Sequence, residues 1–543
     1  MKKAMHAAAA AAALAAIGAA GSASLAAQQR PGLRLVSPIG ANPTQLLDGQ
    51  GVVVHTWPGA NSIISYILED GSLLRGMIEP NNGFPGTTGR LQKLDIDGNV
   101  TWDLLVSSPS RLMHHDIHGL PNGNVLVMAA DYLPASDGID QGRDPSLLPA
   151  AEWLPESILE IQQTGPTTGQ VVWEWHITDH LVQDFDSTKS NYGVVADHPE
   201  LVDINFPPIA LAFGDWNHCN GIDYDPVEDW IVISSREQSE VWLIDHSTTT
   251  AEAAGHTGGA RGKGGDLLWR WGNPQVYDRG TNADRQLFRQ HDPRFLSAGT
   301  PGQGQMTIFN NNAFANQSAV LEIDLPRDPQ GMPFIEPISN AFGPLAPVWT
   351  FTEPGFFSGF VSSAERLPNG NTLICSGSQS RIFEIDPAGT TVWSYTHPAQ
   401  SILFQAQSVQ RRLWASTTEI SVANGGIIDL TTIVDTEHTN EFYYLLGTLS
   451  GQSPGTLLPG GVVLPLNTDG LLLGMLQFAN IGVFVDTFGQ IDAQGKAKPS
   501  ILIPPGLLIP ALVGAELDFA HVLLDGTGIA NEVSNVVTVK IVP

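Results

Sequence analysis

Apolar and polar residues alternate along most of the chain in short runs, which Gly, Pro and Asn interrupt. Residues 94–104 show the pattern clearly: Leu-Asp-Ile-Asp-Gly-Asn-Val-Thr-Trp-Asp-Leu. Alternation with a period of two is typical of strands that bury one face. An Asp-Gly-Asn segment between two such runs indicates a tight turn. The sequence therefore predicts many short antiparallel strands and few helices.

This strand-turn-strand unit recurs loosely from about residue 45 to about residue 416. Its most recognisable part is a strand that ends near a Trp, and the six copies contain Trp57, Trp102, Trp173, Trp269, Trp349 and Trp393. Strand units repeated around an axis are typical of a β-propeller, whose blades are four-stranded sheets. The copies predict a six-bladed propeller, with insertions at 131–158, 179–213, 251–264 and 275–288 where their spacing is long. Several unrelated β-sandwiches are the alternative, which the repetition disfavours.

A second repeated segment precedes some of the Trp strands. Residues 114–127 contain Leu-Pro-Asn-Gly-Asn-Val-Leu-Val, and residues 362–374 contain Leu-Pro-Asn-Gly-Asn-Thr-Leu-Ile. Asn-Gly supplies the positive φ angles that a tight hairpin turn requires. Both segments therefore predict hairpins within blades.

The character of the chain changes after Ser416. Residues 425–543 contain no Trp, no Arg and three Lys, and they alternate between short apolar runs and Gly or Pro. This pattern predicts a small antiparallel β-sandwich. The expected fold is therefore all-β, with a six-bladed β-propeller at 28–418 and a C-terminal module at 425–543. The module carries no cluster that predicts catalysis, and we expect it to be dispensable for chemistry.

The N-terminus has the pattern of an export signal. Lys2 and Lys3 precede an Ala-rich apolar run at 7–20, and small residues follow at 21–28. A charged start, a short apolar stretch and a small-residue cleavage zone are typical of signal peptides. We expect residues 1–27 to be removed and the protein to be periplasmic or extracellular. No later apolar run is long enough to predict a transmembrane helix.

Composition narrows the possible partners. The chain has 26 Lys and Arg against 55 Asp and Glu, a formal net charge of −29, which argues against binding nucleic acid. Hydrophobic residues make up 42% of the chain, enough to exclude global disorder. Cys219 and Cys375 are the two cysteines, too few for a Cys-based zinc site. We expect both to be free and buried, although export would permit a disulfide.

Histidines recur at one register of the predicted blades. His115 lies five residues before Leu120, and His291 lies five residues before Leu296. His218 opens the intervening blade, and His114 precedes His115. Equivalent positions of a propeller converge at one mouth of its channel, so we expect these histidines to share a site. A separate structural role for each histidine is the alternative.

Arg236 follows His218 in the same predicted blade. Its planar guanidinium is suited to a tetrahedral oxyanion such as sulfate or phosphate. A structural salt bridge is the alternative for Arg236. Converging histidines can also bind a divalent metal, but an arginine among them disfavours a metalloenzyme. A non-catalytic propeller that binds a glycan or partner remains a third possibility.

The order of these motifs resembles that of the bacterial arylsulfotransferases over roughly residues 50–410. The motifs that carry the resemblance are His-His-Asp with Leu-Pro-Asn-Gly-Asn, Trp-Asn-His-Cys-Asn-Gly-Ile, Ser-Ser-Arg-x-x-Ser, Trp-Gly-Asn-Pro, Gln-His-Asp and Phe-Asn-Asn-Asn. The resemblance implies a six-bladed propeller and an exported enzyme that moves a sulfuryl group from an aryl sulfate to a phenol. It also implies that no nucleotide cofactor is used, and we assign no metal to the site.

The resemblance assigns a role to each candidate site residue. His291 matches the family's nucleophilic histidine, which becomes sulfated. His218, Asn220 and Arg236 match residues that hold the sulfuryl oxygens. His115 matches the remaining active-site histidine, with His114 as its adjacent alternative.

The chain also departs from the best-known members of that family. It is too short before the propeller for their N-terminal β domain, and they lack its C-terminal module. A family threonine and a family lysine near the pocket have no clear match, and Ser362 is a candidate only by its register before Leu367.

Overall fold

The computed structural model describes residues 29–40, 42–59, 61–79, 84–148, 151–207, 214–329, 331 and 341–543. The predicted signal peptide at 1–27 lies outside these residues. In the part of the chain that the structure describes, no helix is long and apolar enough to cross a membrane. The α-helices are short: α2 (Ala135–Asp140), α3 (Thr250–Ala253) and α4 (Gly470–Gln477).

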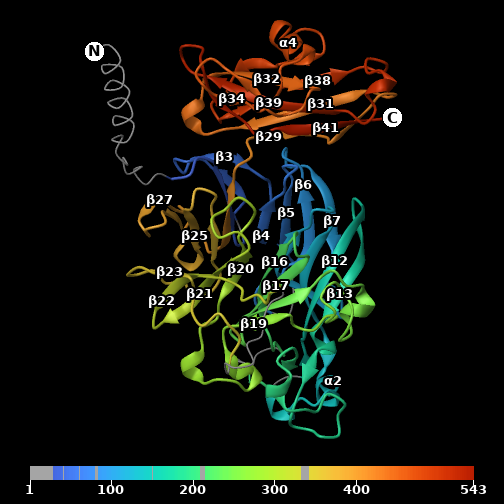
Figure 1. Cartoon of the computed structure of the whole chain (residues 1–543), viewed down its shortest axis with the longest axis vertical. Helices are drawn as coiled ribbons and strands as arrows, with labels where there is room; N and C mark the ends of the chain where they lie inside the picture. Colours follow the sequence, from blue (N-terminus) through green and yellow to red (C-terminus); the bar gives the residue numbers. More distant parts are fainter. Residues whose placement is uncertain are drawn as a thin grey trace, which may run out of the picture.

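Four-stranded antiparallel sheets make up the larger part of the molecule, and the described residues form six of them (Figure 1). From one edge to the other they are β4 (Ser62–Ile67), β5 (Leu73–Ile78), β6 (Gly89–Leu94) and β7 (Val100–Leu105); β8 (Arg111–Gly119), β9 (Val125–Asp131), β12 (Glu156–Gly165) and β13 (Thr168–His176); β16 (Cys219–Asp225), β17 (Trp230–Ser235), β18 (Glu240–Asp245) and β19 (Trp269–Trp271); β20 (His291–Phe295), β21 (Met306–Phe314), β22 (Gln317–Ile323) and β23 (Trp349–Phe351); β24 (Ser363–Arg366), β25 (Thr372–Ser376), β26 (Arg381–Ile385) and β27 (Thr391–Thr396); and β28 (Leu403–Val409), β1 (Leu33–Pro38), β2 (Gln45–Leu47) and β3 (Val53–Thr56).

The first strands of these sheets, β4, β8, β16, β20, β24 and β28, are called the inner strands below. Each inner strand contacts the next, and β28 contacts β4, so the inner strands close a ring. The last sheet joins both ends of this region, because β28 pairs with β1. The chain therefore has a β-propeller-like arrangement. An insertion within one sheet adds the short strand pair β10 (Leu133–Pro134) and β11 (Glu152–Trp153), and an insertion between two sheets adds β14 (Leu181–Val182) and β15 (Val202–Asp203).

The repeated Trp residues lie at the opposite edge of each sheet from the inner strand. Five of them lie on β7, β13, β19, β23 and β27, and Trp57 directly follows β3. Both Leu-Pro-Asn-Gly-Asn segments form the predicted hairpins, with Leu120 paired to Asn124 and Leu367 paired to Asn371. Only the glycine of each Asn-Gly pair has a positive φ, 87° at Gly123 and 88° at Gly370. The turns are therefore longer than a two-residue hairpin turn with two left-handed residues. The prediction of free, buried cysteines is confirmed for Cys219 and Cys375.

Two sheets form the C-terminal module (Figure 1, orange to red). One contains β29 (Leu413–Ala415), β31 (Gly426–Ile433), β38 (Ser500–Ile503), β35 (Phe484–Val485) and β37 (Lys496–Ala497). The other contains β30 (Glu419–Ser421), β41 (Val537–Val542), β39 (Glu516–Leu524), β32 (Phe442–Thr448), β36 (Phe488–Gln490) and β40 (Ala530–Val533), while β33 (Thr456–Leu457) pairs with β34 (Val463–Leu464).

Both sheets of the module contribute to one apolar core, in which Ile428 and Ile501 face Leu445 and Phe519. The strand pairs are antiparallel except that β30 runs parallel to β41. Since β29 pairs with β31, the strands of the module begin at Leu413, before the expected start at 425.

The module packs against the sheet of β1, β2 and β3. Trp414 and Ile433 of the module share a buried cluster with Leu33, Leu46 and Trp57. Arg412 and Asp435 form a buried ion pair of 2.7 Å close to this cluster. The contact is thus a continuous apolar core with a buried charge pair beside it.

We expect Trp414→Ala to destabilise the protein without changing the sulfuryl-transfer kinetics that the family resemblance implies. Trp414 is 1% exposed, and truncating a buried Trp costs about 3–5 kcal/mol of unfolding free energy. Urea unfolding monitored by intrinsic fluorescence measures the loss of unfolding free energy. Turnover of an aryl sulfate, at a temperature where the variant is folded, measures the kinetics. Reduced kcat/KM in the folded variant would show that the module helps to shape the active site.

Candidate active site

Three neighbouring inner strands begin with an irregularity that redirects their side chains. The pairing register shifts between Met113 and Ile117 in β8, and equivalent shifts follow Cys219 in β16 and His291 in β20. His115 and His218 lie within or beside these bulges in the left-handed region, with φ of 50° and 48°. Such conformations cost about 1–3 kcal/mol each in a non-Gly residue and concentrate at functional sites. Bulges are a common device for aiming a side chain at an active site.

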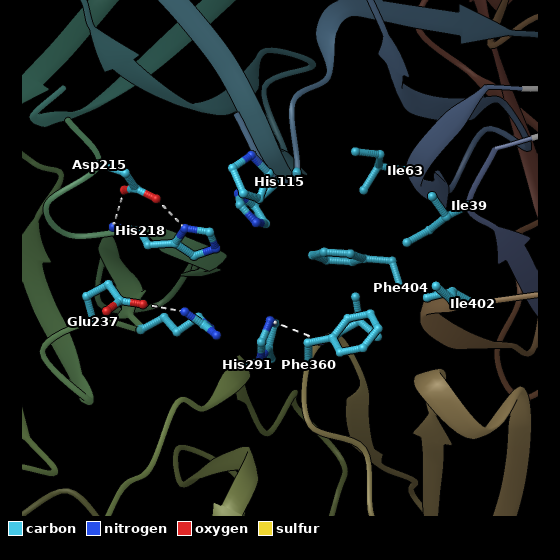
Figure 2. Close-up of a pocket in the computed structure, with 14 residues that line it drawn as sticks. Ile39, Ile63, His115, Asp215, His218, Glu237, His291, Phe360, Ile402 and Phe404 are labelled. Atoms are coloured by element: carbon cyan, nitrogen blue, oxygen red, sulfur yellow. Dashed lines mark hydrogen bonds and ion pairs between the residues drawn. The ribbon is translucent and has the colours of Figure 1, made fainter. Parts of the chain in front are cut away.

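The redirected side chains line a cavity of about 410 Å³ (Figure 2). Imidazole, guanidinium and carboxylate groups gather on one side of it, and aliphatic and aromatic side chains gather on the other. The polar side consists of His115, Asp215, His218, Arg236, Glu237 and His291; the apolar side consists of Ile39, Ile63, Phe360, Val361, Ile402 and Phe404. The cavity can therefore hold a molecule with one anionic and one apolar end.

His291 has a defined tautomer. Its Nδ1 lies 2.7 Å from Asn311 Oδ1, and the Asn311 amide nitrogen donates to the carbonyl oxygens of Ser358 and Val361 at 2.8 Å each. The amide orientation leaves Asn311 Oδ1 as an acceptor, so Nδ1 of His291 carries the proton. The Nε2 lone pair accepts a hydrogen bond of 3.1 Å from the Val361 backbone N–H. Burial and the nearby charge of Arg236 lower the pKa of His291 to about 3, so the ring is neutral.

The His218 ring is held by the carboxylate of Asp215, which lies three residues earlier in the same loop. Asp215 Oδ2 lies 2.5 Å from His218 Nδ1, and Asp215 Oδ1 accepts the His218 backbone N–H at 3.1 Å. The carboxylate therefore fixes the ring through Nδ1 and leaves Nε2 for a ligand. The ring centroids of His218 and His115 lie 4.7 Å apart, which places two imidazoles side by side.

His114 connects His115 to a buried glutamate. His114 Nε2 lies 3.0 Å from Glu156 Oε2, and His114 Nδ1 lies 3.0 Å from His115 Nδ1. Burial lowers the pKa of His114, but the charge of Glu156 and their hydrogen bond outweigh it and raise the pKa overall. Burial, followed by the nearby imidazoles and Arg236, lowers the pKa of His115. His115 is therefore neutral in the cavity, while His114 holds its orientation from behind.

Arg236 forms the salt bridge that was the alternative for it, and it also lies at the cavity. Its guanidinium forms an ion pair with Glu237, and both side chains line the cavity. Burial lowers the pKa of Arg236, and the charge of Glu237 opposes that shift. A partly desolvated guanidinium beside His291 is a strong site for an anion.

The structure brings together four predicted site residues and places the others behind them. His115, His218, Arg236 and His291 line the cavity. His114 does not line it, and Asn220 donates instead to the Gln290 carbonyl oxygen at 2.9 Å. The Ser362 hydroxyl donates to Ser358 Oγ at 2.8 Å and accepts the Gly377 N–H, so it does not line the cavity either.

The aspartates that follow the histidines in the motifs join neighbouring sheets. Asp116 Oδ2 accepts the Ile222 N–H at 3.1 Å, and Asp292 Oδ2 accepts the Ala364 N–H at 3.0 Å. Each carboxylate thus ties its inner strand to the next one. The aspartates of the His-His-Asp and Gln-His-Asp motifs therefore have a structural role.

Sequence reasoning missed Asp215, Glu237, Asn311 and Phe404. Asp215 and Glu237 lie beside or within the motifs of His218 and Arg236, and Asn311 is the second of the three asparagines in Phe-Asn-Asn-Asn, so their proximity was a usable signal. Phe404 lies on β28 far from every motif, and its 6.4 Å ring separation from His291 had no signal in the sequence. Among the described residues, one group brings three potential metal-ligand atoms within 4.8 Å, and it contains none of the cavity histidines.

Comparisons with solved structures give weak matches. A Bacteroides caccae protein of unknown function is 14% identical, with a TM-score of 0.39 over 70% of this chain and 100% of that chain. The periplasmic gluconolactonase of Pseudomonas aeruginosa is 12% identical, with a TM-score of 0.36 over 70% and 99%. Virginiamycin B lyase from Staphylococcus aureus is 9% identical, with a TM-score of 0.31 over 68% and 86%. Scores this low do not bear on the activity of this chain.

The sequence comparisons are more decisive. No curated protein sequence matches the chain. The family model described as Arylsulfotransferase (ASST) matches residues 42–412, which include all six inner strands and every residue of the polar side of the cavity. The chain therefore belongs to the arylsulfotransferase (ASST) family of sulfotransferase enzymes.

Proposed function

We propose that this chain transfers a sulfuryl group from an aryl sulfate to a phenolic acceptor through a sulfohistidine on His291, without a nucleotide cofactor. The observation that carries the proposal is the neutral His291, whose Nε2 lone pair lies beside Arg236 in a cavity with one apolar wall. A neutral imidazole is a nucleophile for sulfur and a good leaving group afterwards.

We also propose that the six sheets are the blades of a six-bladed propeller, with the cavity at one mouth of its channel. The closed ring of inner strands supports this interpretation. In such a propeller the bulged starts of β8, β16 and β20 meet at that mouth. The distance in sequence between His115 and His291 then has no bearing on their distance in space.

In the first half-reaction, His291 Nε2 attacks the sulfur of the donor. The N–S bond forms as the S–O bond to the aryl group breaks, and the phenolate leaves with the electron pair. Positive charge grows on the imidazole, and Asn311 Oδ1 stabilises it through the Nδ1–H. The Val361 N–H loses Nε2 as its acceptor and becomes free to donate to a sulfuryl oxygen.

Arg236 and His218 act on the oxygen atoms of the sulfuryl group and of the leaving phenolate. Arg236 binds the sulfuryl oxygens, whose charge must be balanced in the transition state. His218, held through Nδ1 by Asp215, delivers a proton to the departing phenolate. In the second half-reaction a phenol returns that proton to His218 and attacks the sulfur, and His291 leaves as a neutral imidazole.

The apolar wall suits the aryl part of donor and acceptor. Phe404 lies 6.2 Å from the His115 ring and 6.4 Å from the His291 ring, measured between centroids. Ile39, Ile63 and Ile402 extend the same wall. Aromatic rings bind by burying area against such side chains and by edge-to-face packing.

Export is part of the proposal and is supported by the sequence of residues 1–27. A phenolic substrate outside the cytoplasm has no access to a nucleotide sulfate donor there. A mechanism that stores the sulfuryl group on a histidine fits that location.

The test is turnover of para-nitrophenyl sulfate with and without phenol. Two-step transfer predicts ping-pong kinetics and a burst of para-nitrophenol in the absence of acceptor. The burst should equal the concentration of active sites, and added phenol should be recovered as its sulfate ester. Absence of any turnover over a panel of aryl sulfates would contradict the proposal.

The burst should also survive acidification. Because burial and Arg236 lower the pKa of His291, the reactive neutral form persists well below the usual histidine pKa of about 6.5. We expect the burst rate at about pH 5 to stay within a few-fold of its value at about pH 7, since para-nitrophenolate leaves without needing a proton. Quenched-flow measurement gives both rates. A burst rate that falls tenfold or more, with an apparent pKa near 6.5, would mean that the nucleophile titrates normally.

A further inference from the structure

A second cluster that contains histidines lies outside the cavity, in one insertion between two sheets and one within a sheet. His180 follows the turn after β13, while His256 and Asp266 flank the Gly-rich loop that follows α3. One ligand atom from each of the three side chains lies within 4.8 Å of the other two. The family model and the transfer mechanism assign no role to these residues.

Close packing fixes the position of the His180 ring. His180 is fully buried, and its ring stacks on Trp175 with 5.6 Å between centroids and 4° between planes. Trp175 Nε1 donates to the Gly265 carbonyl oxygen at 2.8 Å. A Cβ at Gly265 would come within 2.6 Å of His180 Nε2 and within 2.0 Å of the Ala253 carbonyl oxygen. The backbone before Asp266 can pass over the His180 ring only because residue 265 is a glycine.

The hydrogen bonds of His180 leave one nitrogen as a ligand. Nε2 lies 2.8 Å from the Ala253 carbonyl oxygen, an acceptor only, so Nε2 carries a proton. Nδ1 faces Asp266 Oδ1 at 2.9 Å and must carry a proton to bond that acceptor, so a metal ion would bind Nδ1 by displacing this proton. Metal-bound histidines characteristically donate their other ring N–H to a carbonyl or carboxylate in this way.

His256 points a nitrogen at the same carboxylate oxygen. His256 Nδ1 lies 2.8 Å from Asp266 Oδ1. Two imidazole nitrogens and a carboxylate oxygen thus converge on one small region, and both His180 and Asp266 are buried there. A cation at the centre of the cluster can be coordinated by all three ligand atoms at once. Small outward movements of the side chains would provide the usual metal–ligand distances of about 2.0–2.2 Å.

We propose that His180, His256 and Asp266 bind a divalent transition-metal ion, with Zn²⁺ as the ion that best fits the ligand set. Two imidazoles with one carboxylate suit zinc and its neighbours, whereas Ca²⁺ and Mg²⁺ prefer oxygen ligands throughout. His256 also lines a separate cavity of about 670 Å³, from which water can supply the fourth ligand.

The ion joins two parts of the chain that are distant in sequence. It ties the loop carrying His256 and Asp266 to the turn that carries His180, so we expect it to stabilise this corner of the molecule. None of its ligands lines the catalytic cavity, so sulfuryl transfer has no need of it. The inference is therefore independent of the proposed function.

The test uses the full chain without an affinity tag, stripped by a chelator and then dialysed. Isothermal titration with Zn²⁺ should show a single equivalent bound per chain, and elemental analysis after dialysis should recover it. Zn²⁺ binding to the folded state should raise Tm by a few degrees over the stripped protein. If the stripped chain takes up no Zn²⁺ and its Tm is unchanged, the cluster is a buried hydrogen-bonded ion pair and the proposal is wrong.

Variants locate the site. His256→Ala removes an exposed ligand with little risk to folding and should abolish both uptake and the Tm rise, and Asp266→Asn should weaken uptake strongly. His198→Ala is the matched control, because His198 is an exposed histidine at the same cavity whose Nδ1 bonds Glu200 at 3.1 Å. Equal uptake by His256→Ala and the wild type would overturn the assignment. Turnover of aryl sulfate should be unchanged in all three variants, which keeps this test separate from that of the transfer reaction.

Discussion

His291→Ala should abolish the burst and steady-state turnover of para-nitrophenyl sulfate while leaving the fold intact. The variant removes the only atom proposed to bond to sulfur, so neither half-reaction can proceed. We expect kcat to fall by several orders of magnitude, as on losing the nucleophile of other covalent enzymes. Mass spectrometry of wild-type protein quenched in base during the burst should find the sulfuryl adduct on the peptide that contains His291.

A matched control separates loss of the nucleophile from a general disturbance of the histidines. His118 also lies on an inner strand, but it pairs with Asp223 at 3.1 Å and does not line the catalytic cavity. His118→Ala should therefore keep its burst. An adduct on another residue, or a normal burst in His291→Ala, would contradict the assigned nucleophile and leave His218 or His115 to be tested in its place.

Most of the strand pattern was predictable because it is local. The Asn-Gly segments form hairpins, and the Trp copies fall at one edge of each four-stranded sheet, since both signals depend on neighbouring residues. The pairing of β28 with β1 was not predictable in the same way. Those strands lie at opposite ends of the propeller-like region, and no short-range pattern shows which distant strands pair.

In the active site, too, the features that depend on local sequence were predictable and those that depend on distant residues were not. The register of His115 and His291 before their leucines was visible, and both residues line the cavity. The groups that orient these rings were not visible, because Asn311 contacts His291 from the neighbouring strand β21, and Glu156 of β12 acts on His115 only through His114. The apolar wall comes from segments with no chemical motif, of which Phe404 is the clearest case. The cluster of His180, His256 and Asp266 lies in insertions, where periodicity gives no guidance.

Arg236 has either a catalytic role, in which it binds the sulfuryl group, or only a structural role. If its role is catalytic, Arg236→Lys and Arg236→Ala should both lose kcat/KM for the aryl sulfate donor, and to a similar extent. A planar guanidinium holds two sulfuryl oxygens at once, whereas a lysine ammonium offers a single compact charge. Losing one such contact in a desolvated site costs about 10²–10³-fold, or about 2.7–4 kcal/mol of transition-state stabilisation. The loss should appear in kcat/KM for the donor, because the contact strengthens as charge moves onto the oxygens.

The ion pair with Glu237 supplies the competing expectation, and stability measurements distinguish the two. If Arg236 only balances Glu237, both variants should lose Tm while their folded fraction turns over donor normally. Arg366 is the matched control, since it pairs with Glu322 in the same manner outside the catalytic cavity. Arg366→Lys should therefore keep normal donor kinetics. Donor kinetics and Tm measured on the same three variants decide the matter: unchanged kinetics in Arg236→Lys would remove Arg236 from the reaction, and the anion would then have to be held by the histidines and the Val361 N–H alone.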